Sequence, residues 1–333
     1  MKPLLIAILA AFPGSALAAE RLPILDMHLH AREADYAGHN PPPLCAPFAV
    51  MPRWDTNLPG FDGMAFEGEP CARPVFPVKT TAEQRGQTLA IMQRRNIIGM
   101  VSGAPGQVDP YKAAAPERVI VGLDLHITGP NALSPDHVRA LYKAGRFTVL
   151  GEVMAQYDGV PANDPRMEPY WALAEELGIP VGIHMGPSEP AGPYMGSPAF
   201  RARNSSPLLL EDVLVAHPKL RVYIMHAGYP FADDLRALMF SHPQVYVDIA
   251  SIDYTEPTPA FHAFLRELVE AGYGDRILFG SDQMIWPGVI EPAIAVIEEA
   301  PFLTQAQKRA ILYDNAARFL RLSPATIARH KAM

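Results

Sequence analysis

Six histidine and acidic residues stand at the ends of five short apolar runs. They are His28, His30, Glu152, His184, His226 and Asp282. Each run has the composition of a buried parallel strand, and each residue lies at or just past the carboxyl end of its strand. In a β/α barrel these strand ends open into one mouth, where the active site lies. Imidazoles and carboxylates gathered there bind divalent metals, so the sequence predicts a metal-dependent enzyme.

The first pair has the spacing that a shared metal requires. Because side chains alternate along a strand with period two, the imidazoles of His28 and His30 point to the same face. An HxH pair alone is a weak signal in a chain with 11 histidines. Its position directly after the apolar run of residues 23–27 strengthens the interpretation.

Eight apolar runs are predicted to be strands. They cover residues 23–27, 97–102, 119–125, 148–154, 180–185, 221–226, 245–250 and 276–282. Amphipathic segments with helix start and stop signals lie between them, for example residues 81–95, where Thr81 and Gln84 are placed as a capping box. Strands that alternate with helices favour a TIM (β/α)8 barrel. A doubly wound open sheet is the alternative, but it gathers ligands mainly at one switch point.

One long segment interrupts this alternation. Residues 31–80 are rich in Pro and Gly and show no periodicity, so we expect a lid inserted after the first strand. Cys45 and Cys71, the two cysteines of the chain, both lie in it. A disulfide between them is the favoured interpretation in an exported protein, and two buried thiols are the alternative.

The N-terminus has the pattern of a secretory signal peptide. Lys2 precedes a short apolar stretch, and Ala16-x-Ala18 matches a cleavage site, which predicts a signal peptide at 1–18 and a single mature domain at 19–333. An uncleaved anchor is the alternative, although the apolar run is too short to span a bilayer. We therefore expect a periplasmic or secreted protein that is not held in a membrane after cleavage.

The charge of the chain narrows the choice of partners. The formal net charge is −7, and no basic patch suited to nucleic acid is present in the sequence. A small-molecule substrate is the expected partner, and a homodimer is the expected assembly if the chain is not monomeric.

Several motifs, taken in order, resemble one enzyme family. The chain resembles the amidohydrolase superfamily, and more narrowly the branch that holds aminocarboxymuconate-semialdehyde decarboxylase. The motifs that carry this resemblance are ILDMHLH, GEV, GIHMG, IMHAGYP and ILFGSD. The closing ILYDNAARFLRL at residues 311–322 is similar to the last helix of that branch. The resemblance covers nearly the whole mature chain except the insertion.

The resemblance implies roles for the strand-end residues. His28, His30, His184 and Asp282 match the ligands of a one-metal site, which would leave His226 as a catalytic imidazole. A two-metal site would recruit Glu152 and His226 as well. The sequence does not decide between the two, although this branch often uses one metal. Glu152 could also be a buried structural acid.

The chemistry of such a site follows from general principles. A divalent cation lowers the pKa of bound water to about 7. Asp282 could take that proton and pass it to a leaving group, while His226 could polarise a substrate carbonyl. Zinc suits mixed imidazole and carboxylate ligands best, with manganese or iron as alternatives.

Two reaction classes remain open. One is hydrolysis of a C–N or C–O bond in an amide, lactone or ester, and the other is non-oxidative decarboxylation or hydration of an unsaturated or aromatic acid. A carboxylate clamp beside the metal would favour the second, and Arg201, Arg203 and Arg53 are the candidates for it. Each could equally be a solvated surface cation. A binding or metal-storage protein without catalysis is a third hypothesis, and the substrate itself is not predicted.

Overall fold

A computed structural model describes residues 21–38, 41–58, 64–65, 71 and 73–333. The predicted signal peptide at 1–18 lies outside the described residues. Within the described part of the chain, no helix is both long enough and apolar enough to cross a membrane.

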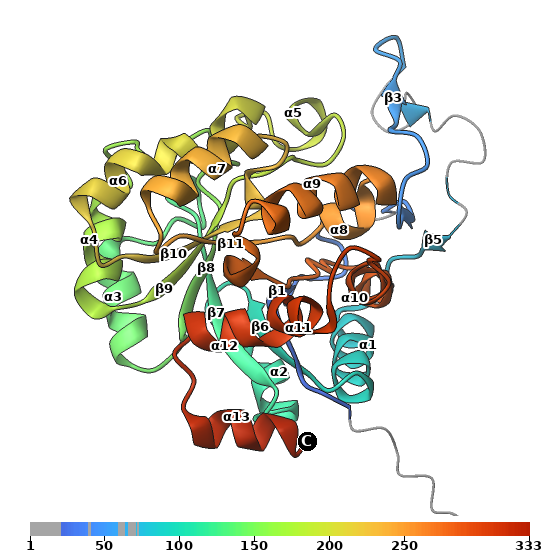
Figure 1. The fold of residues 1–333 in the computed structure, drawn as a ribbon. Helices are drawn as coiled ribbons and strands as arrows, with labels where there is room; N and C mark the ends of the chain where they lie inside the picture. The colour runs from blue at the N-terminus through green and yellow to red at the C-terminus, as the bar shows by residue number, and fades with distance from the viewer. Residues whose placement is uncertain (1–20, 39–40, 59–63, 66–70, 72) are drawn as a thin grey trace, which may run out of the picture.

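Eight parallel strands form the barrel that the sequence predicts (Figure 1). They are β1 (Ile24–His30), β6 (Ile97–Ser102), β7 (Val119–Leu125), β8 (Val149–Val153), β9 (Pro180–His184), β10 (Arg221–Met225), β11 (Tyr246–Asp248) and β12 (Ile277–Leu278), in that spatial order. Two backbone hydrogen bonds join the first strand to the segment after the last. Met27 N–H donates to the Phe279 carbonyl at 2.9 Å, and Asp282 N–H donates to the His28 carbonyl at 2.7 Å. These bonds bring the two ends of the sheet together.

The helices form a ring outside the strands (Figure 1). They are α1 (Thr81–Arg94), α2 (Asp109–Ala114), α3 (Pro135–Lys143), α4 (Glu168–Leu177), α6 (Glu211–Ala216), α7 (Ala232–Ser241), α9 (Thr258–Glu270) and α10 (Ile290–Glu298). The chain closes with α11 (Gln305–Arg309), a π turn over residues 310–314, α12 (Asn315–Phe319) and α13 (Pro324–Lys331). The short helices α5 (Gly192–Met195) and α8 (Ile252–Thr255) lie in loops after β9 and β11.

One helix start differs from the prediction. The cap of α1 is Thr80, whose hydroxyl accepts from the Glu83 N–H at 3.1 Å. Thr81 instead donates its hydroxyl to Glu33 at 2.6 Å, so it ties the insertion to the helix. The sequence alone could not separate two adjacent threonines that are equally able to cap.

The core has two layers. The larger one fills the space between the outer face of the strands and the helices, and it includes Ile97, Leu150 and Ile224. A smaller cluster, which includes Met27 and Tyr223, continues onto the C-terminal helices around Tyr313 and Phe319. Fully buried side chains of this size each contribute roughly 1.5–3 kcal/mol by leaving water.

The insertion after β1 carries two small antiparallel pairs. β2 (Leu44–Cys45) pairs with β5 (Pro74–Val75), and β3 (Arg53–Trp54) pairs with β4 (Met64–Ala65). The predicted disulfide between Cys45 and Cys71 is present, with the two Cα atoms 5.1 Å apart.

The insertion contacts loops at the carboxyl end of the barrel. Phe48 N–H donates to the Thr255 carbonyl, and the Trp286 indole donates to the Pro42 carbonyl, both at 3.1 Å. The rings of Trp54 and Tyr194 lie 4.9 Å apart. A lid role for residues 31–80 stays a prediction.

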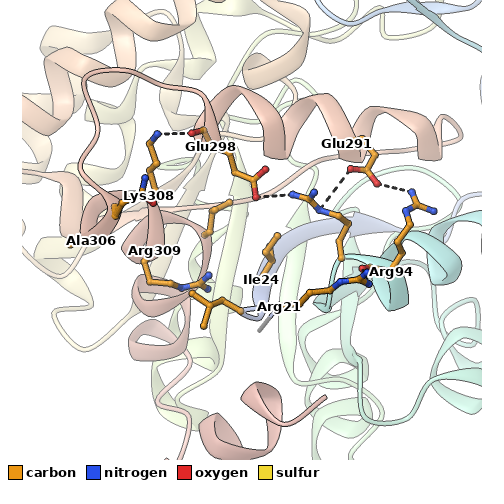
Figure 2. A pocket seen from close by; sticks show the side chains of 12 residues that line it. Arg21, Ile24, Arg94, Glu291, Glu298, Ala306, Lys308 and Arg309 are labelled. Atoms are coloured by element: carbon orange, nitrogen blue, oxygen red, sulfur yellow. Dashed lines mark hydrogen bonds and ion pairs between the residues drawn. The ribbon is translucent and has the colours of Figure 1, made fainter. Parts of the chain in front are cut away.

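A cleft of about 860 Å³ lies near the amino end of β1 (Figure 2). Its charged walls are paired: Arg94 meets Glu291 at 2.6 Å, and Arg95 meets Glu298 at 2.7 Å. Because the six predicted ligands lie at the carboxyl ends of the strands, this cleft does not belong to the candidate site.

Candidate metal centre

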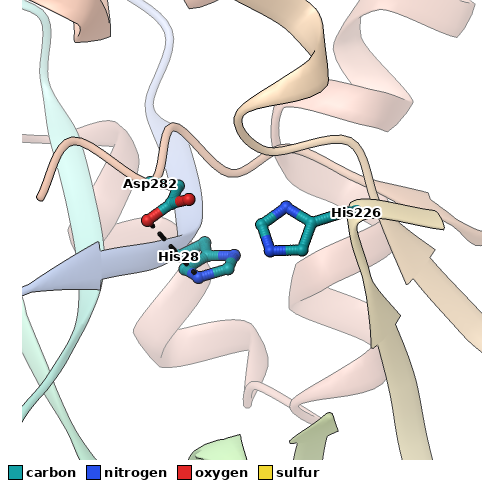
Figure 3. A group of neighbouring side chains, drawn as sticks. All are labelled: His28, His226 and Asp282. Carbon is teal, nitrogen blue, oxygen red and sulfur yellow. Dashed lines mark ion pairs between the residues drawn. The ribbon is translucent and has the colours of Figure 1, made fainter. Parts of the chain in front are cut away.

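The six predicted ligands converge on one place in the barrel mouth. His28 and His30 lie in the last three residues of β1, Glu152 lies on β8, and His184 ends β9. His226 directly follows β10, and Asp282 lies in the loop after β12. The four imidazoles and Glu152 are buried. Figure 3 shows His28, His226 and Asp282 facing one another across the barrel, although they lie far apart in the sequence.

Every imidazole of the group is fixed through its Nδ1 atom. The partners are Asp248 for His28 at 3.0 Å, Ser102 for His30 at 3.0 Å, Gln156 for His184 at 2.8 Å and the Ala250 carbonyl for His226 at 2.8 Å. A carboxylate or carbonyl acceptor at Nδ1 holds the ring proton on that nitrogen, so Nε2 keeps a free lone pair. Histidines that bind metals in proteins are oriented in the same way. The Nε2 atoms of His28 and His30 are buried and have no hydrogen-bond partner. Orphaned buried nitrogens of this kind fit a metal ion.

Glu152 stands between two histidine pairs. Its Oε2 atom lies 4.0 Å from His28 Nε2 and 3.5 Å from His30 Nε2. Its Oε1 atom lies 3.9 Å from His184 Nε2 and 4.0 Å from His226 Nε2. Ligand atoms that surround one metal at about 2.0–2.2 Å are separated by up to about 4 Å. Each oxygen of Glu152 therefore belongs to a separate group of possible ligands.

Asp282 completes the first of these groups. Its Oδ1 atom lies 3.1 Å from His30 Nε2 and 3.8 Å from His28 Nε2, and it has no hydrogen-bond partner of its own. The residues present thus fit a divalent cation held by His28, His30, Asp282 and Glu152. A second cation would be held by Glu152, His184 and His226.

The electrostatics of the group favour a cation. Burial lowers the pKa of His184 and His226 and helps lower that of His30 to about 4, so these rings are neutral, the form that binds metal. Burial also opposes protonation of His28, but the nearby Asp248, Asp282 and Glu152 raise the pKa of His28 to about 10. The negative charges that stabilise a proton on this buried imidazole would also stabilise a metal ion bound in its place.

Two motif glycines leave room for the ligands. A Cβ atom on Gly186 would lie 2.5 Å from the Cβ of His226, and one on Gly280 would lie 2.7 Å from the Cβ of His28. The backbone of His226 and Asp282 adopts positive φ angles, 60° and 45°, which non-glycine residues rarely do. Such backbone conformations cluster at functional sites, where surrounding structure holds them.

Sequence reasoning missed residues that support the ligands. Asp248 ends the seventh strand, and the period-two rule that joins His28 to His30 also places Arg32 on the same face. Arg32 is buried and ion-paired with Asp124, and its Nη2 lies 3.9 Å from Glu152. Gln156, also missed, sits in a turn after β8 where no pattern marks it.

The three arginines predicted to form a carboxylate clamp are surface residues. Arg201, Arg203 and Arg53 are exposed. The Arg201 guanidinium donates to the carbonyls of Pro198 at 2.9 Å and Phe200 at 2.6 Å. A substrate-binding role for these three residues stays a prediction.

Comparison with solved structures finds several proteins that share this barrel fold. 5-Carboxyvanillate decarboxylase LigW from Sphingomonas paucimobilis superposes with a TM-score of 0.58 at 17% identity, covering 91% of this chain and 100% of that one. 4-Oxalomesaconate hydratase LigJ from Rhodopseudomonas palustris gives 0.55 at 18%, covering 93% and 99%. A probable 2-pyrone-4,6-dicarboxylic acid hydrolase from Acinetobacter baumannii gives 0.54 at 13%, covering 90% and 100%. At these identities the likeness concerns the fold alone.

Sequence comparison gives the family. A curated relative, the protein fluG of Emericella nidulans, is 23% identical over 108 residues, which is 32% of this chain but only 12% of fluG. The amidohydrolase family model (Amidohydro_2) matches residues 25–322. This range includes all six candidate ligands and runs from the first strand to the end of the last barrel helix. The chain therefore belongs to the amidohydrolase family.

Proposed function

We propose that this protein is a metal-dependent hydrolase that cleaves a C–N or C–O bond in an amide, lactone or ester. The observation that carries the proposal is the position of Glu152, whose two oxygens face two different histidine pairs. A carboxylate placed in this way supports a two-metal centre, and the one-metal arrangement is the alternative. Zinc is the proposed metal, because imidazole and carboxylate ligands suit it, with manganese or iron as alternatives.

Individual residues of the chain have separate proposed roles in the reaction. A divalent metal supplies Lewis acidity and a water that ionises near neutral pH. Asp282 is the proposed proton carrier: it accepts a proton from the attacking water and returns it to the leaving group. Although burial opposes it, the neighbouring His28 and His30 lower the pKa of Asp282, so the carboxylate is ionised and ready to accept. In the one-metal arrangement, neutral His226 would offer its Nε2 lone pair as a proton acceptor in place of binding a second cation, because its Nδ1 donates to the Ala250 carbonyl.

Decarboxylation or hydration of an unsaturated or aromatic acid is the second candidate. The observation that favours it is buried Arg32, a cation 3.9 Å from Glu152 that could meet a substrate carboxylate. The LigW and LigJ enzymes, whose names give these reactions, share the barrel fold. Product analysis separates these reactions: decarboxylation releases carbon dioxide, hydration removes a carbon–carbon double bond, and hydrolysis of an amide, ester or lactone leaves a new carboxylic acid.

The test is the metal content of the purified protein, counted per chain by elemental analysis for the wild type and for Glu152→Gln. We expect two metals per chain in the wild type and at most one in the variant, because an amide cannot bridge two cations as a carboxylate does. Glu299→Gln, an exposed glutamate at the end of α10, is the matched control and should keep both metals. One metal in the wild type would reject the two-metal centre, and no metal after reconstitution would reject the proposed function.

Asp282→Asn tests the proton carrier. An asparagine keeps the size of the side chain and one ligating oxygen but cannot take up a proton, so turnover should fall by roughly 10²–10⁴-fold while metal stays bound. Hydrolysis of an ester and amide panel, together with metal content, measures both. Unchanged turnover would remove Asp282 from the mechanism.

We also propose that the protein is exported and acts on a small molecule. Two observations support export: the predicted signal peptide at 1–18 and the disulfide between Cys45 and Cys71, a bond typical of oxidising compartments. Cell fractionation and the mass of the mature protein test it, and a cytoplasmic protein of full length would contradict it. A homodimer stays a prediction, which light scattering would check.

A further inference from the structure

A second cleft lies at the amino end of the barrel, away from the candidate metal centre. Its volume is about 680 Å³, which is within the range of small-molecule sites. Arg221 and Tyr246, the first residues of β10 and β11, line it together with the ends of α4 and α12. Because His226 follows the last residue of β10, the cleft and the candidate metal ligands lie at opposite ends of this strand.

The walls of this cleft carry positive charge that no acid balances. Four cations line it, and none of them has a carboxylate within ion-pairing distance in the described part of the chain: Lys219, Arg221, Arg318 and Arg321. Two glutamates also line the cleft, but both are engaged. Glu176 accepts two hydrogen bonds from Arg139, at 2.6 and 2.7 Å. Glu175 accepts from the Lys219 N–H at 2.7 Å and lies 3.1 Å from His217. Since the whole chain has a net charge of −7, this cluster does not follow from a basic composition.

Arg221 shows how close together these charges lie. Its Nη1 atom donates to the Phe319 carbonyl at 3.2 Å and its Nη2 atom to the Gly178 carbonyl, so it satisfies the ends of two helices. Its Nε atom is buried and has no hydrogen-bond partner among the described residues. Burial, and after it the neighbouring Arg321, lower the pKa of Arg221. Two guanidinium groups therefore repel each other here, and an anion beside them would relieve the repulsion.

Arg321 occupies a backbone position that favours glycine. It directly follows the end of α12 with a φ of 56°. Its N–H donates to the Arg318 carbonyl at 3.0 Å, and the Leu322 N–H donates to the Ala317 carbonyl at 2.9 Å. Helices that end with these two bonds usually have glycine at this position, because a side chain is strained in the left-handed conformation. The helix end does not account for an arginine here, so the side chain needs another explanation.

The groups that remain free to bind a ligand in this cleft are donors. Arg318 uses its Nε for the Tyr246 hydroxyl at 3.2 Å and its Nη2 for the Asn315 side chain at 3.0 Å, which leaves its Nη1. Tyr246 accepts the first of these bonds and keeps its own O–H to donate. The side chains of Lys219 and Arg321 make no hydrogen bond within the described residues. Free donors and unbalanced positive charge together favour an anion.

We propose that this cleft binds a small anion with at least two negative charges, which belong to phosphate or carboxylate groups. Arg321 and Lys219 provide the charges that hold it, and Arg318 contributes its free Nη1 atom. A ligand with several charges suits the cleft because several separate cations line it. The site uses none of the six candidate metal ligands, so it does not depend on the proposed reaction.

Calorimetry on the metal-loaded full-length protein tests this with three probes. They are fructose 1,6-bisphosphate, tricarballylate and acetate, compared at low ionic strength, where screening is weakest. We expect at least one of the two multivalent probes to bind at one site per chain and acetate, with its single charge, to give no measurable binding. The tighter of the two shows whether phosphate or carboxylate groups are preferred. If neither multivalent probe binds, the proposal is overturned.

Arg321→Gly separates binding from folding. Losing the guanidinium should weaken the bound probe roughly 10- to 100-fold, as expected for charge-assisted hydrogen bonds. The same change should raise the urea midpoint, because glycine suits the left-handed backbone. Lys219→Gln should also weaken the probe. The matched control is Arg21→Gln, which removes an exposed arginine from the larger cleft of Figure 2 and should leave the affinity unchanged.

Three results would contradict the proposal. Equal affinities of the wild type and Arg321→Gly would show that Arg321 does not hold the anion. Weaker binding in Arg21→Gln alone would place the anion in the larger cleft. Binding that survives in Arg321→Gly and disappears after chelation would belong to the metal centre. None of these results decides the proposed reaction, which metal content and product analysis test separately.

Discussion

The chemistry of this centre depends on which nitrogen of each imidazole carries a proton. Acceptor atoms of Asp248, Gln156 and Ala250 fix that choice for His28, His184 and His226, and Asp248 makes the most contacts of the three. One of its oxygens accepts from His28 Nδ1 at 3.0 Å, and the other accepts the backbone N–H groups of His226 at 2.9 Å and Ala250 at 3.1 Å. A single carboxylate therefore orients one ligand and the loop that carries another.

Asp248→Asn should weaken metal binding by roughly 10–100-fold with little change in the fold. An asparagine has one oxygen for two sets of donors. Its amide group must face either the backbone N–H groups or His28 Nδ1, and the second choice moves the His28 proton to Nε2, the ligand atom. Competition with a fluorescent chelator measures the affinity.

The control for this experiment is Asp233→Asn, an exposed aspartate at the start of α7. It should leave the affinity unchanged. Equal affinities for Asp248→Asn and the wild type would show that Asp248 does not set the proton position on His28.

At the scale of elements, the strands were the most predictable part. The runs at 97–102 and 119–125 coincide with β6 and β7, because strands covered on both faces must be continuously apolar. Residues 31–80 carry no pattern in the sequence, since the two-residue strands of the pairs β2–β5 and β3–β4 are too short to show an alternation. Asp248 and Arg32 carried a usable signal, a polar side chain at a strand end. The sequence does not distinguish a polar residue that binds the metal from one that only supports a metal ligand.

Helix packing around the barrel contains a pH-sensitive contact. His217 ends α6, and its ring nitrogens lie 3.0 Å from Glu168 and 3.1 Å from Glu175 of α4. Burial opposes protonation, but hydrogen bonds to these two carboxylates raise the pKa of His217 above its ordinary value of 6.5. Protonated histidine is also favoured at the carboxyl end of a helix.

His217→Gln should destabilise the protein at low pH and have less effect at high pH. Because the folded pKa is the higher one, the stabilising contribution is fully present below about pH 6.5 and is lost as the pH rises through the raised value. Urea unfolding at pH 6 and pH 9 gives the difference between wild type and variant at each pH. His137→Gln, at an exposed position in α3, should show no such trend, and a constant difference for His217→Gln would contradict the prediction.

For the whole molecule, the candidate centre joins strands from the start, middle and end of the barrel. Without a cation, the carboxylates of Glu152 and Asp282 share a buried space with Asp248 nearby. Burial raises the pKa of Glu152 to about 8, which shows how poorly this space accommodates another negative charge. Metal binding would therefore stabilise the complete barrel rather than one loop.

Removing metal with a chelator should lower the melting temperature by roughly 5–10 °C. A ligand present at about 100 times its Kd stabilises a protein by about 2.7 kcal/mol, and each kcal/mol shifts Tm by about 2–4 °C in a domain of this size class. Scanning calorimetry before chelation, after it and after zinc is added back would measure the shift. A Tm that does not respond would show that the six residues hold no structural metal.

The backbone hydrogen bonds that join the first strand to the segment after the last strand have a consequence for biosynthesis. His28 and His30 are synthesised with the first strand of the barrel, whereas Asp282 follows only after the eighth strand has been made. The backbone bonds from Met27 to Phe279 and from Asp282 to His28 form only then. A nascent or truncated chain thus offers scattered histidines but no assembled pocket. Binding of a metal by all six residues would therefore require that synthesis has passed the eighth strand and that the barrel has closed.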